Sequence, residues 1–291
     1  MPSAKDLIAE GSEKLKDHRC PDAEPGRDAV FLAAHALNRS REWLLAHSET
    51  AVAPAAVRRY RALLARRLKH EPLSYLLGTA NFRGRTFEVR RGTTLIPRWA
   101  TETLTLAAAK ELSRLPQLVA LDVGTGSGCI AVSLAADLSQ AQIIATDASA
   151  SALAIAKRNA AALGFRGCVV FRRGDLAAPA LRDLPDGRPL AVVANLPYLP
   201  DSSFASLPPE IRLYEPKNAL VAGPDGLDLY RRLADQLAAV RHRPLFLFWE
   251  ALTEQYEPLK KIVMEKFPSA SCRPIANDTG ITIGLAASSG S

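Results

Sequence analysis

The sequence LVALDVGTGSGC at residues 118–129 joins an apolar run to a glycine-rich turn, and a helical pattern follows without a break. Glycines at a strand-to-helix turn let a ligand approach the backbone and expose the first amides of the helix to it. The glycine spacing here is G-x-G-x-G, whereas a dinucleotide site has G-x-G-x-x-G. The turn therefore predicts a ligand-binding loop in an α/β fold, and its spacing argues against a dinucleotide.

From about residue 118 onward, short apolar segments alternate with helical patterns, which is typical of a parallel α/β sheet. The last two expected strands are separated only by Asn277-Asp278-Thr279-Gly280, which is hairpin spacing. One of them must therefore run antiparallel to its neighbour, as in the seven-stranded methyltransferase sheet and unlike a dehydrogenase sheet. The expected strands are 118–123, 142–146, 168–172, 190–194, 245–249, 271–276 and 281–285. The expected helices are 101–112, 129–138, 149–163, 226–240 and 253–267.

The region before this alternation has a different character. The chain has 291 residues, enough for about two domains, and residues 1–77 show helical patterns throughout. Phe82, Phe87 and Val89 alternate with polar residues around Gly84, which suggests a strand pair. We therefore expect a helical domain over 1–78, a β-ribbon connector over 79–98 and an α/β domain over 99–291. The expected N-terminal helices are 4–17, 28–37, 41–47 and 54–69.

The first third of the chain carries all of the net positive charge. Residues 1–98 hold 18 Lys and Arg against 11 Asp and Glu, a balance of +7, whereas residues 99–291 hold 19 of each. Charge gathered in one region favours an acidic or nucleic-acid-associated partner there; the other interpretation is a solvated basic face. The expected helix 54–69 contains no acid, and its basic residues are Arg58, Arg59, Arg61, Arg66, Arg67 and Lys69.

Several protein classes are not expected. The longest apolar runs, such as 129–136, are far shorter than the ~20 residues of a membrane span, and residues 1–10 lack the apolar segment of a signal peptide. The four cysteines are scattered and form no C-x-x-C pair, so neither a metal site nor a disulfide framework is expected. We expect a reduced, cytoplasmic protein with no membrane association, and a disordered tail over 287–291. The cysteines are Cys20, Cys129, Cys168 and Cys272.

Acidic residues follow the next two strands. Asp147 ends the second strand, where this architecture places the acceptor of the two ribose hydroxyls of a nucleotide. Asp175 follows the third strand and is placed for the edge of an adenine. An acid at each of three consecutive strands is typical of S-adenosylmethionine sites, although any single one could be a turn or N-cap residue. The predicted cofactor loop consists of Gly124, Thr125, Gly126, Ser127 and Gly128.

The fourth strand ends in Asn195-Leu196-Pro197-Tyr198, the most informative tetrapeptide in the chain. A planar NH2 nitrogen is hard to methylate because its lone pair is delocalised, so a site must hold both N–H groups and aim the nitrogen. The Asn195 side-chain oxygen and a backbone carbonyl can accept those two hydrogen bonds, Pro197 fixes the backbone, and the Tyr198 ring packs on the target. Catalysis would then be orientation and electrostatics. The plainer interpretation is an Asn-x-Pro turn after a buried strand.

Taken together, these motifs resemble the HemK/PrmC methyltransferases, which methylate the glutamine side-chain nitrogen in the Gly-Gly-Gln motif of peptide chain release factors. The resemblance spans nearly the whole chain and includes the glycine loop and the Asn195–Tyr198 motif. Its other segments are EPLSYLLG at 71–78, LIPR at 95–98, Thr101-Glu102, Asn159, YEP at 214–216 and GPDGL at 223–227.

This resemblance implies that S-adenosylmethionine lies over Gly124–Gly128, with Asp147 on its ribose. It also implies that the helical domain helps to dock the release factor, with no direct requirement for nucleic acid. The basic helix 54–69 and the ribbon 82–91 are the expected contacts, and charge reversal at Arg58, Arg59, Arg66 and Arg67 is expected to weaken methylation. The implied adenine contacts are Asp175 and Leu176; Asn195 also borders the cofactor, and the substrate-binding residues are Asn195, Leu196, Pro197, Tyr198, Pro97 and Arg98.

Three departures from the family pattern bear on the substrate. Leu196 replaces the first proline of N-P-P-Y, which keeps every group expected to touch the target amide. Trp99 and Ala100 replace a proline and an acid after Pro97-Arg98, which could reshape the substrate pocket. The family's C-terminal D-x-x-G-x-x-R is present only as Asp278-Thr279-Gly280.

Three alternatives remain open at the level of sequence. The motif N-L-P-Y is the form found in ribosomal RNA adenine N6-dimethyltransferases, although that family places its helical domain after the catalytic domain. A ribosomal protein glutamine methyltransferase has nearly the same layout. A non-catalytic binding module with the methyltransferase fold is the third, motivated by Trp99 and Ala100.

Overall fold

The computed structural model describes residues 1–16, 24–182, 184–185, 187–239 and 244–290. The chain divides into two compact units, of which one contains Met1–Thr79 together with Ser206–Tyr214, and the other contains Ala80–Ala205 together with Glu215–Ser291. The expected helix ends at Asp17 and Val240, the cysteine Cys20 and the last tail residue Ser291 lie outside the described residues. The sequence-based domain boundaries stay a prediction.

The first unit is built from helices, as the sequence predicts. Their packed faces bury Leu7, Leu32, Tyr60 and Leu64 in one apolar cluster. Local signals fix their ends: Pro25 and Pro54 occupy first-turn positions, where a missing N–H costs nothing, and the Ser40 hydroxyl accepts a hydrogen bond from the Trp43 amide. The helices are α1 (Ala4–Lys16), α2 (Pro25–Leu37), α3 (Arg41–Ala46), α4 (Pro54–Arg67) and α5 (Leu73–Leu77).

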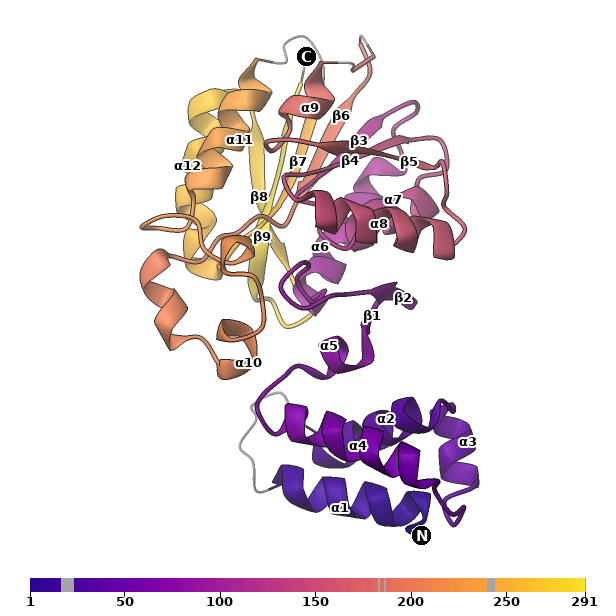
Figure 1. Cartoon of the computed structure of the whole chain (residues 1–291). Coiled ribbons are helices and arrows are strands. Elements are labelled where there is room, and N and C mark those ends of the chain that lie inside the picture. The colour runs from indigo at the N-terminus through magenta and orange to yellow at the C-terminus, as the bar shows by residue number, and fades with distance from the viewer. Residues whose placement is uncertain (17–23, 183, 186, 240–243, 291) are drawn as a thin grey trace. The chain divides into compact units, whose positions relative to one another are not determined.

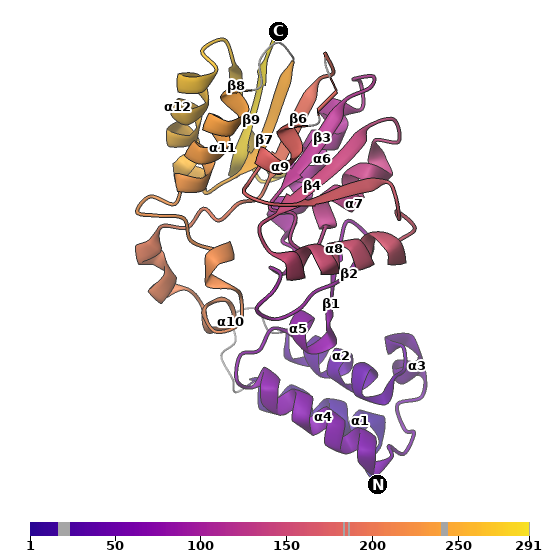
Figure 2. The ribbon, with the colours of Figure 1, turned by 45° about the horizontal axis from the view of Figure 1, so that its top comes forward.

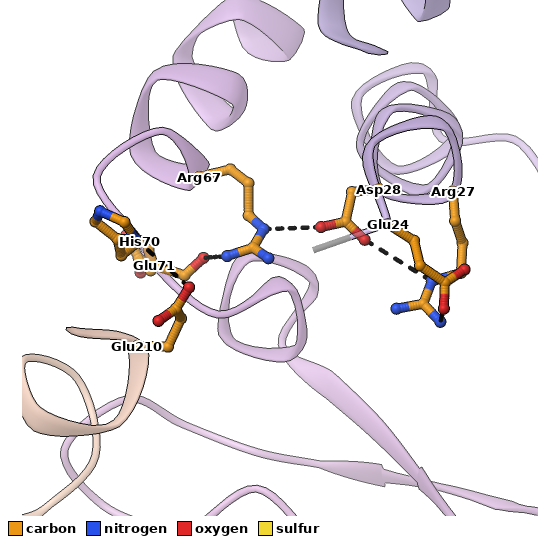
Figure 3. Close-up of polar contacts among 7 residues, drawn as sticks. All are labelled: Glu24, Arg27, Asp28, Arg67, His70, Glu71 and Glu210. Carbon is orange, nitrogen blue, oxygen red and sulfur yellow. Dashed lines mark hydrogen bonds and ion pairs between the residues drawn. The ribbon is translucent and has the colours of Figure 1, made fainter. Parts of the chain in front are cut away.

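The basic stripe of α4 is not a uniformly solvated face. Arg67 is 2% exposed, and its Nε donates to Asp28 Oδ2 at 2.9 Å, inside the helical unit (Figure 3). Arg66 pairs with Glu71 at 2.6 Å, and Arg59 donates to the Ala36 carbonyl at 2.8 Å. The expectation that Arg67 contributes to a docking surface is therefore wrong, because its charge is buried and paired within the fold.

A short segment from far along the chain completes the helical unit. The segment Ser206–Tyr214 contains α10 (Pro209–Arg212), and the side chain of Glu210 is almost fully buried there. His70 Nδ1 lies 3.5 Å from Glu210 Oε1 (Figure 3). The Tyr214 hydroxyl donates to the Lys69 carbonyl at 2.6 Å. No pattern in the sequence predicts this return to the helical unit.

The second unit is a seven-stranded sheet in the order β5-β4-β3-β6-β7-β9-β8, and its fold class is the one predicted (Figures 1 and 2). The first five strands in this order are parallel, whereas β9 is antiparallel to both β7 and β8. The strands are β3 (Val119–Val123), β4 (Gln142–Asp147), β5 (Val169–Arg173), β6 (Leu190–Ala194), β7 (Leu245–Glu250), β8 (Ser271–Ala276) and β9 (Thr282–Ser289).

Helices cover both faces of this sheet (Figures 1 and 2). Side chains alternate along each strand, so Val119 and Leu121 of β3 enter one apolar core and Ala120 enters the other. The first core also contains residues of α6, α7 and α8, and the second contains residues of α9, α11 and α12. These helices are α6 (Trp99–Leu112), α7 (Cys129–Asp137), α8 (Ala150–Ala162), α9 (Ala178–Leu181), α11 (Asp228–Ala238) and α12 (Tyr256–Lys266). Three short 3-10 helices are η1 (Asp201–Ser206), η2 (Lys217–Ala219) and η3 (Thr253–Gln255).

The expected strand pair before the sheet forms β1 (Thr79–Phe82) and β2 (Arg85–Glu88). Its two-residue turn places Arg83 at φ 47° and Gly84 at φ 73°, which is the geometry of a type I′ hairpin turn. Phe82 and Phe87 are fully buried in the core under α6 and α7. The ribbon therefore packs as part of the second unit.

The expected disorder of the C-terminal tail over 287–291 is wrong for most of that segment. The tail from Ala287 is not disordered through Ser289, because β9 continues to that residue and pairs with β7 and β8. Within the described ranges, no helix is both long and apolar enough to cross a membrane. The same residues contain no group of three or more His, Cys, Asp or Glu side chains arranged to hold a metal ion.

Candidate active site

The glycine loop turns directly from the end of β3 into α7. Gly124, Gly126 and Gly128 have φ of 76°, 55° and 83°, a region in which a side chain would be strained. A Cβ on Gly128 would lie 3.0 Å from the Cβ of Ala156, so this glycine also lets α8 approach closely. The amides of Gly124 and Thr125 both donate to the Thr146 carbonyl at 2.9 Å. The loop thus presents open backbone beside the end of β4.

Asp147 lies at that end of β4 and is held by the loop. Its Oδ2 accepts from the Gly126 amide at 2.9 Å, and its Oδ1 accepts from the Ser149 amide at 2.8 Å. Burial raises the pKa of Asp147, and the two backbone amides act in the opposite direction. Each carboxylate oxygen has a second lone pair. The side chain is therefore fixed in place with acceptor capacity for a pair of hydroxyls.

Asp122 also supports this loop, a role not predicted from the sequence. Its Oδ2 accepts from the Thr125 hydroxyl at 2.6 Å and from the Ala131 amide at 3.0 Å. Complete burial raises the pKa of Asp122 to about 7. The sign of this role in the sequence is an aspartate within an otherwise apolar strand, VALDV.

Asp175 and Leu176 follow β5, as expected, but Asp175 already has partners. Its carboxylate accepts from Arg232 at 2.7 Å and from Gln236 Nε2 at 3.0 Å, both on α11. The Asp175 side chain is 55% exposed. Leu176 is half-buried, with φ 47°. An adenine contact at this point would form next to an existing surface ion pair.

The Asn195–Tyr198 motif begins where β6 ends, next to the glycine loop. In the sheet register Val123 pairs with Ala194, so Gly124 and Asn195 follow neighbouring parallel strands at the same edge. A Cβ on Gly124 would lie 3.1 Å from Cδ2 of Leu196. The structure therefore brings the predicted cofactor loop and the predicted target motif into contact.

A buried hydrogen-bonded chain holds this motif. Asn195 Nδ2 donates to the Thr101 hydroxyl at 2.8 Å, and that hydroxyl donates to Glu250 Oε2 at 2.7 Å. The Tyr198 hydroxyl donates to the other oxygen of Glu250 at 3.2 Å. Burial raises the pKa of Glu250 to about 7, although the two hydroxyls and the charge of Arg98 oppose this shift.

Backbone contacts fix the motif further. Gln255 Nε2 donates to the Tyr198 carbonyl at 2.7 Å and to the Asp225 carbonyl at 2.9 Å. The Tyr230 hydroxyl lies 2.5 Å from the carbonyl oxygen of Glu250, to which it donates, and 3.4 Å from the Leu196 amide. None of Thr101, Tyr230, Glu250 and Gln255 was assigned a role from sequence. The signal that could have found Glu250 is a carboxylate that ends the apolar strand LFLFWE.

Pro97 and Arg98 precede α6, the helix that carries Thr101. Arg98 pairs with the buried carboxylate of Glu215 at 2.5 Å. This pair attaches the start of α6 to the chain segment that follows Tyr214. Trp99 is 59% exposed, so the residue that replaces the family's proline faces solvent and is not part of the core.

Comparisons with known proteins bear on both parts of the chain. A family model described as the PrmC N-terminal domain matches residues 6–78, and one described as a methyltransferase domain matches residues 120–212. A release factor glutamine methyltransferase of Cereibacter sphaeroides is 43% identical over 213 residues, 72% of each chain. Another, of Bacillus cereus, is 31% identical over 264 residues, covering 88% of this chain and 91% of the relative.

Solved structures support the fold. The hMettl16 catalytic domain in complex with MAT2A 3′UTR hairpin 6 has a TM-score of 0.52 and 15% identity, and the match covers 79% of this chain and 91% of that one. At this identity the likeness concerns the fold alone.

Proposed function

The chain belongs to the release factor glutamine methyltransferase family, and from this premise we propose that it methylates the glutamine side-chain amide of peptide chain release factors. The target is the glutamine of the Gly-Gly-Gln motif, and the modification tunes translation termination in the cytoplasm. Because the matches include the helical region as well as the catalytic one, they do not favour the RNA, ribosomal-protein or non-catalytic alternatives. The observation that carries the proposal is the packing of the Asn195–Tyr198 motif against the glycine loop.

S-adenosylmethionine is the proposed methyl donor, and the residues around the loop fit it. Three glycines at positive φ leave the backbone of Gly124–Gly128 open to a ligand. Asp147 is positioned by two amides and keeps acceptor capacity for the two ribose hydroxyls. When bound there, S-adenosylmethionine supplies an electrophilic methyl group. Leu196 lies against Gly124, which places the target motif next to that part of the loop.

The Asn195–Tyr198 motif is proposed to hold the glutamine amide. Asn195 Nδ2 is occupied by Thr101, so its Oδ1 is the atom that accepts one N–H of the substrate. A backbone carbonyl of the motif accepts the other N–H. The Tyr198 ring, fixed through its hydroxyl by Glu250, packs on the planar target. These contacts supply orientation and charge complementarity, which are the main sources of rate in a transfer without an activated nucleophile.

Labelled S-adenosylmethionine tests this function directly. The protein is incubated separately with a release factor, with ribosomal proteins and with ribosomal RNA, and the labelled residue is located by mass spectrometry. We expect label on the Gly-Gly-Gln glutamine, and none when that glutamine is replaced by alanine. Label on ribosomal protein or RNA without label on the release factor would contradict the proposal.

The helical unit is proposed to help dock the release factor, and the structure narrows the residues to test. Arg58 is exposed on α4, whereas Arg67 is buried with Asp28 and belongs to the fold. Arg58→Glu should raise KM for the full release factor and leave KM for a short Gly-Gly-Gln peptide unchanged. Lys110→Glu is the matched control, because it makes the same charge change on an exposed residue of α6. Equal KM values for Arg58→Glu and Lys110→Glu would exclude Arg58 from docking.

A further inference from the structure

The hydrogen-bonded chain Asn195–Thr101–Glu250 runs in one donor-to-acceptor direction, which is set by the position of the Thr101 hydroxyl proton. A threonine hydroxyl donates one hydrogen bond and can accept others. Because the Thr101 hydroxyl gives its proton to Glu250 Oε2 at 2.7 Å, it can only accept from Asn195, at 2.8 Å. The Asn195 NH2 group must therefore face Thr101, and its oxygen must face away from it.

An ionised Glu250 enforces this direction. A carboxylate only accepts hydrogen bonds, and both oxygens of Glu250 are engaged, one by Thr101 and the other by Tyr198. The side chain is only 1% exposed, so bulk solvent does not compete with these partners. A protonated Glu250 could instead donate to Thr101, whose hydroxyl would then donate to Asn195 and turn the amide around.

Charged and titratable groups lie near Glu250 at the start of α6, on α11 and in the segments that follow β6, whereas β9 faces it with Gly284. Arg98, at the start of α6, favours the ionised form, and Glu215 is paired with that arginine. The Tyr198 hydroxyl donates to the carboxylate, and Tyr230 of α11 donates to the backbone carbonyl of the same residue. Both tyrosines have raised pKa values because they are buried and lie beside Glu250, so both remain neutral donors.

We propose that Glu250 is a positioning residue which, acting through Thr101, fixes the amide of Asn195 so that its oxygen faces the substrate. The site is thereby specific for a planar group that donates two N–H bonds, and it rejects a carboxylate or ester of the same shape. This inference rests on the proposed function for the identity of the substrate, although the direction of the hydrogen-bonded chain is independent of it.

Two substitutions at Thr101 provide a matched test. Thr101→Val keeps the shape and removes the hydroxyl, whereas Thr101→Ser keeps the hydroxyl and removes a methyl group. Misplacement of a substrate-holding group can cost about 10²-fold in rate, so we expect Thr101→Val to lower kcat by about that factor. Thr101→Ser should restore most of the rate, and both variants should bind S-adenosylhomocysteine as the wild type does. Equal kcat in Thr101→Val and the wild type would overturn the proposal.

The side-chain amide protons of Asn195 give a readout that does not depend on activity. In ¹⁵N-labelled protein, their NMR signals are identified by their loss in Asn195→Asp. One of these protons should exchange slowly with solvent in the wild type and in Thr101→Ser, and rapidly in Thr101→Val. Equal exchange in all three proteins would overturn the positioning role, even if the wild type transferred no methyl to a release factor and the proposed function failed.

The pH dependence of kcat tests the role of Glu250. Its pKa near 7 predicts that kcat of the wild type falls below neutral pH, as the carboxylate takes up a proton and can donate to Thr101. Glu250→Gln should have a lower kcat that does not change between pH 6 and pH 8. A wild-type profile retained unchanged in Glu250→Gln would assign the titration to another group and remove Glu250 from the proposal.

Discussion

Two buried carboxylates support the two ends of the site, and they are assembled in different ways. Asp122 lies beneath the glycine loop and Glu250 beneath the target motif, and burial raises the pKa of each to about 7. The partners of Asp122 lie three and nine residues away in the chain. The partners of Glu250, Thr101 and Tyr198, lie 149 and 52 residues away.

This difference shows why one end of the site is encoded locally and the other is not. A single strand, loop and helix hold Asp122 with its partners, so the glycine loop is supported largely from its own segment, and Asp147 joins it from the neighbouring strand β4. The target end needs the start of α6, the end of β6 and the end of β7 to meet at one edge of the sheet. Any change in how these elements pack should therefore affect the target end first.

The largest effect is expected from Asn195→Ala, which removes the side chain at the centre of the target end. Loss of one preorganised hydrogen-bonding group typically costs about 10²–10³ in kcat. S-adenosylhomocysteine affinity should stay near the wild-type value, because the glycine loop and Asp147 are untouched. Calorimetric titration and single-turnover methyl transfer measure the two quantities. Full activity in Asn195→Ala would contradict the assigned role.

At the cofactor end, Asp147→Ala should have the opposite effect and weaken S-adenosylhomocysteine binding while lowering kcat little. A hydrogen bond to a charged group contributes about 1.5–3 kcal/mol, so S-adenosylhomocysteine should bind tens of times more weakly. The rate at saturating cofactor should fall much less than it does in Asn195→Ala. Asp147→Asn is the control, since it keeps the size of the side chain. Unchanged binding in Asp147→Ala would place the ribose elsewhere.

Asp122→Asn tests whether Asp122 takes up its proton near neutral pH in the folded protein. The pKa of Asp122 is higher in the folded chain than in the unfolded one, so the folded state holds the proton more tightly between about pH 4 and 7. Its contribution to stability is therefore present at low pH and is lost as the pH rises toward 7, by up to about 1.4 kcal/mol per pH unit. The free energy of unfolding, measured with urea, should decrease less between pH 6 and pH 8 in Asp122→Asn than in the wild type. An identical decrease in the wild type and in Asp122→Asn would contradict the raised pKa of Asp122.

The smallest effect is expected at the exposed edge of the cofactor end. Arg232→Ala releases the Asp175 carboxylate from a surface ion pair, which is typically worth about 0–1 kcal/mol. If Asp175 accepts from the adenine amine, S-adenosylhomocysteine should bind up to about fivefold more tightly in this variant. Asp175→Asn should abolish that gain. Weaker binding in Arg232→Ala would instead assign the adenine contact to the arginine.

The sequence predicted the parts of the molecule whose signals are local. The glycine loop and the hairpin spacing at 277–280 each lie within one short stretch, as does each single strand or helix of the alternation, and the structure has the corresponding elements. Arg67 of α4 was misread because its partner is Asp28, thirty-nine residues earlier. Glu250 was missed for the same reason, since a carboxylate that ends a strand has no local sign of the hydroxyls that it will accept.

The Ser206–Tyr214 segment has a consequence for how the protein can be divided. The chain leaves the target motif at Tyr198, packs into the helical unit through Glu210, and only then returns to Glu215. The boundary between the units therefore crosses the chain more than once, although the methyltransferase family match continues to residue 212. Removing residues 1–79 would take away the helices against which the segment 206–214 packs, and would leave the buried carboxylate of Glu210 unsupported. A single cut after Thr79 therefore does not separate the two units, because residues 206–214 of the helical unit lie within the sequence of the other.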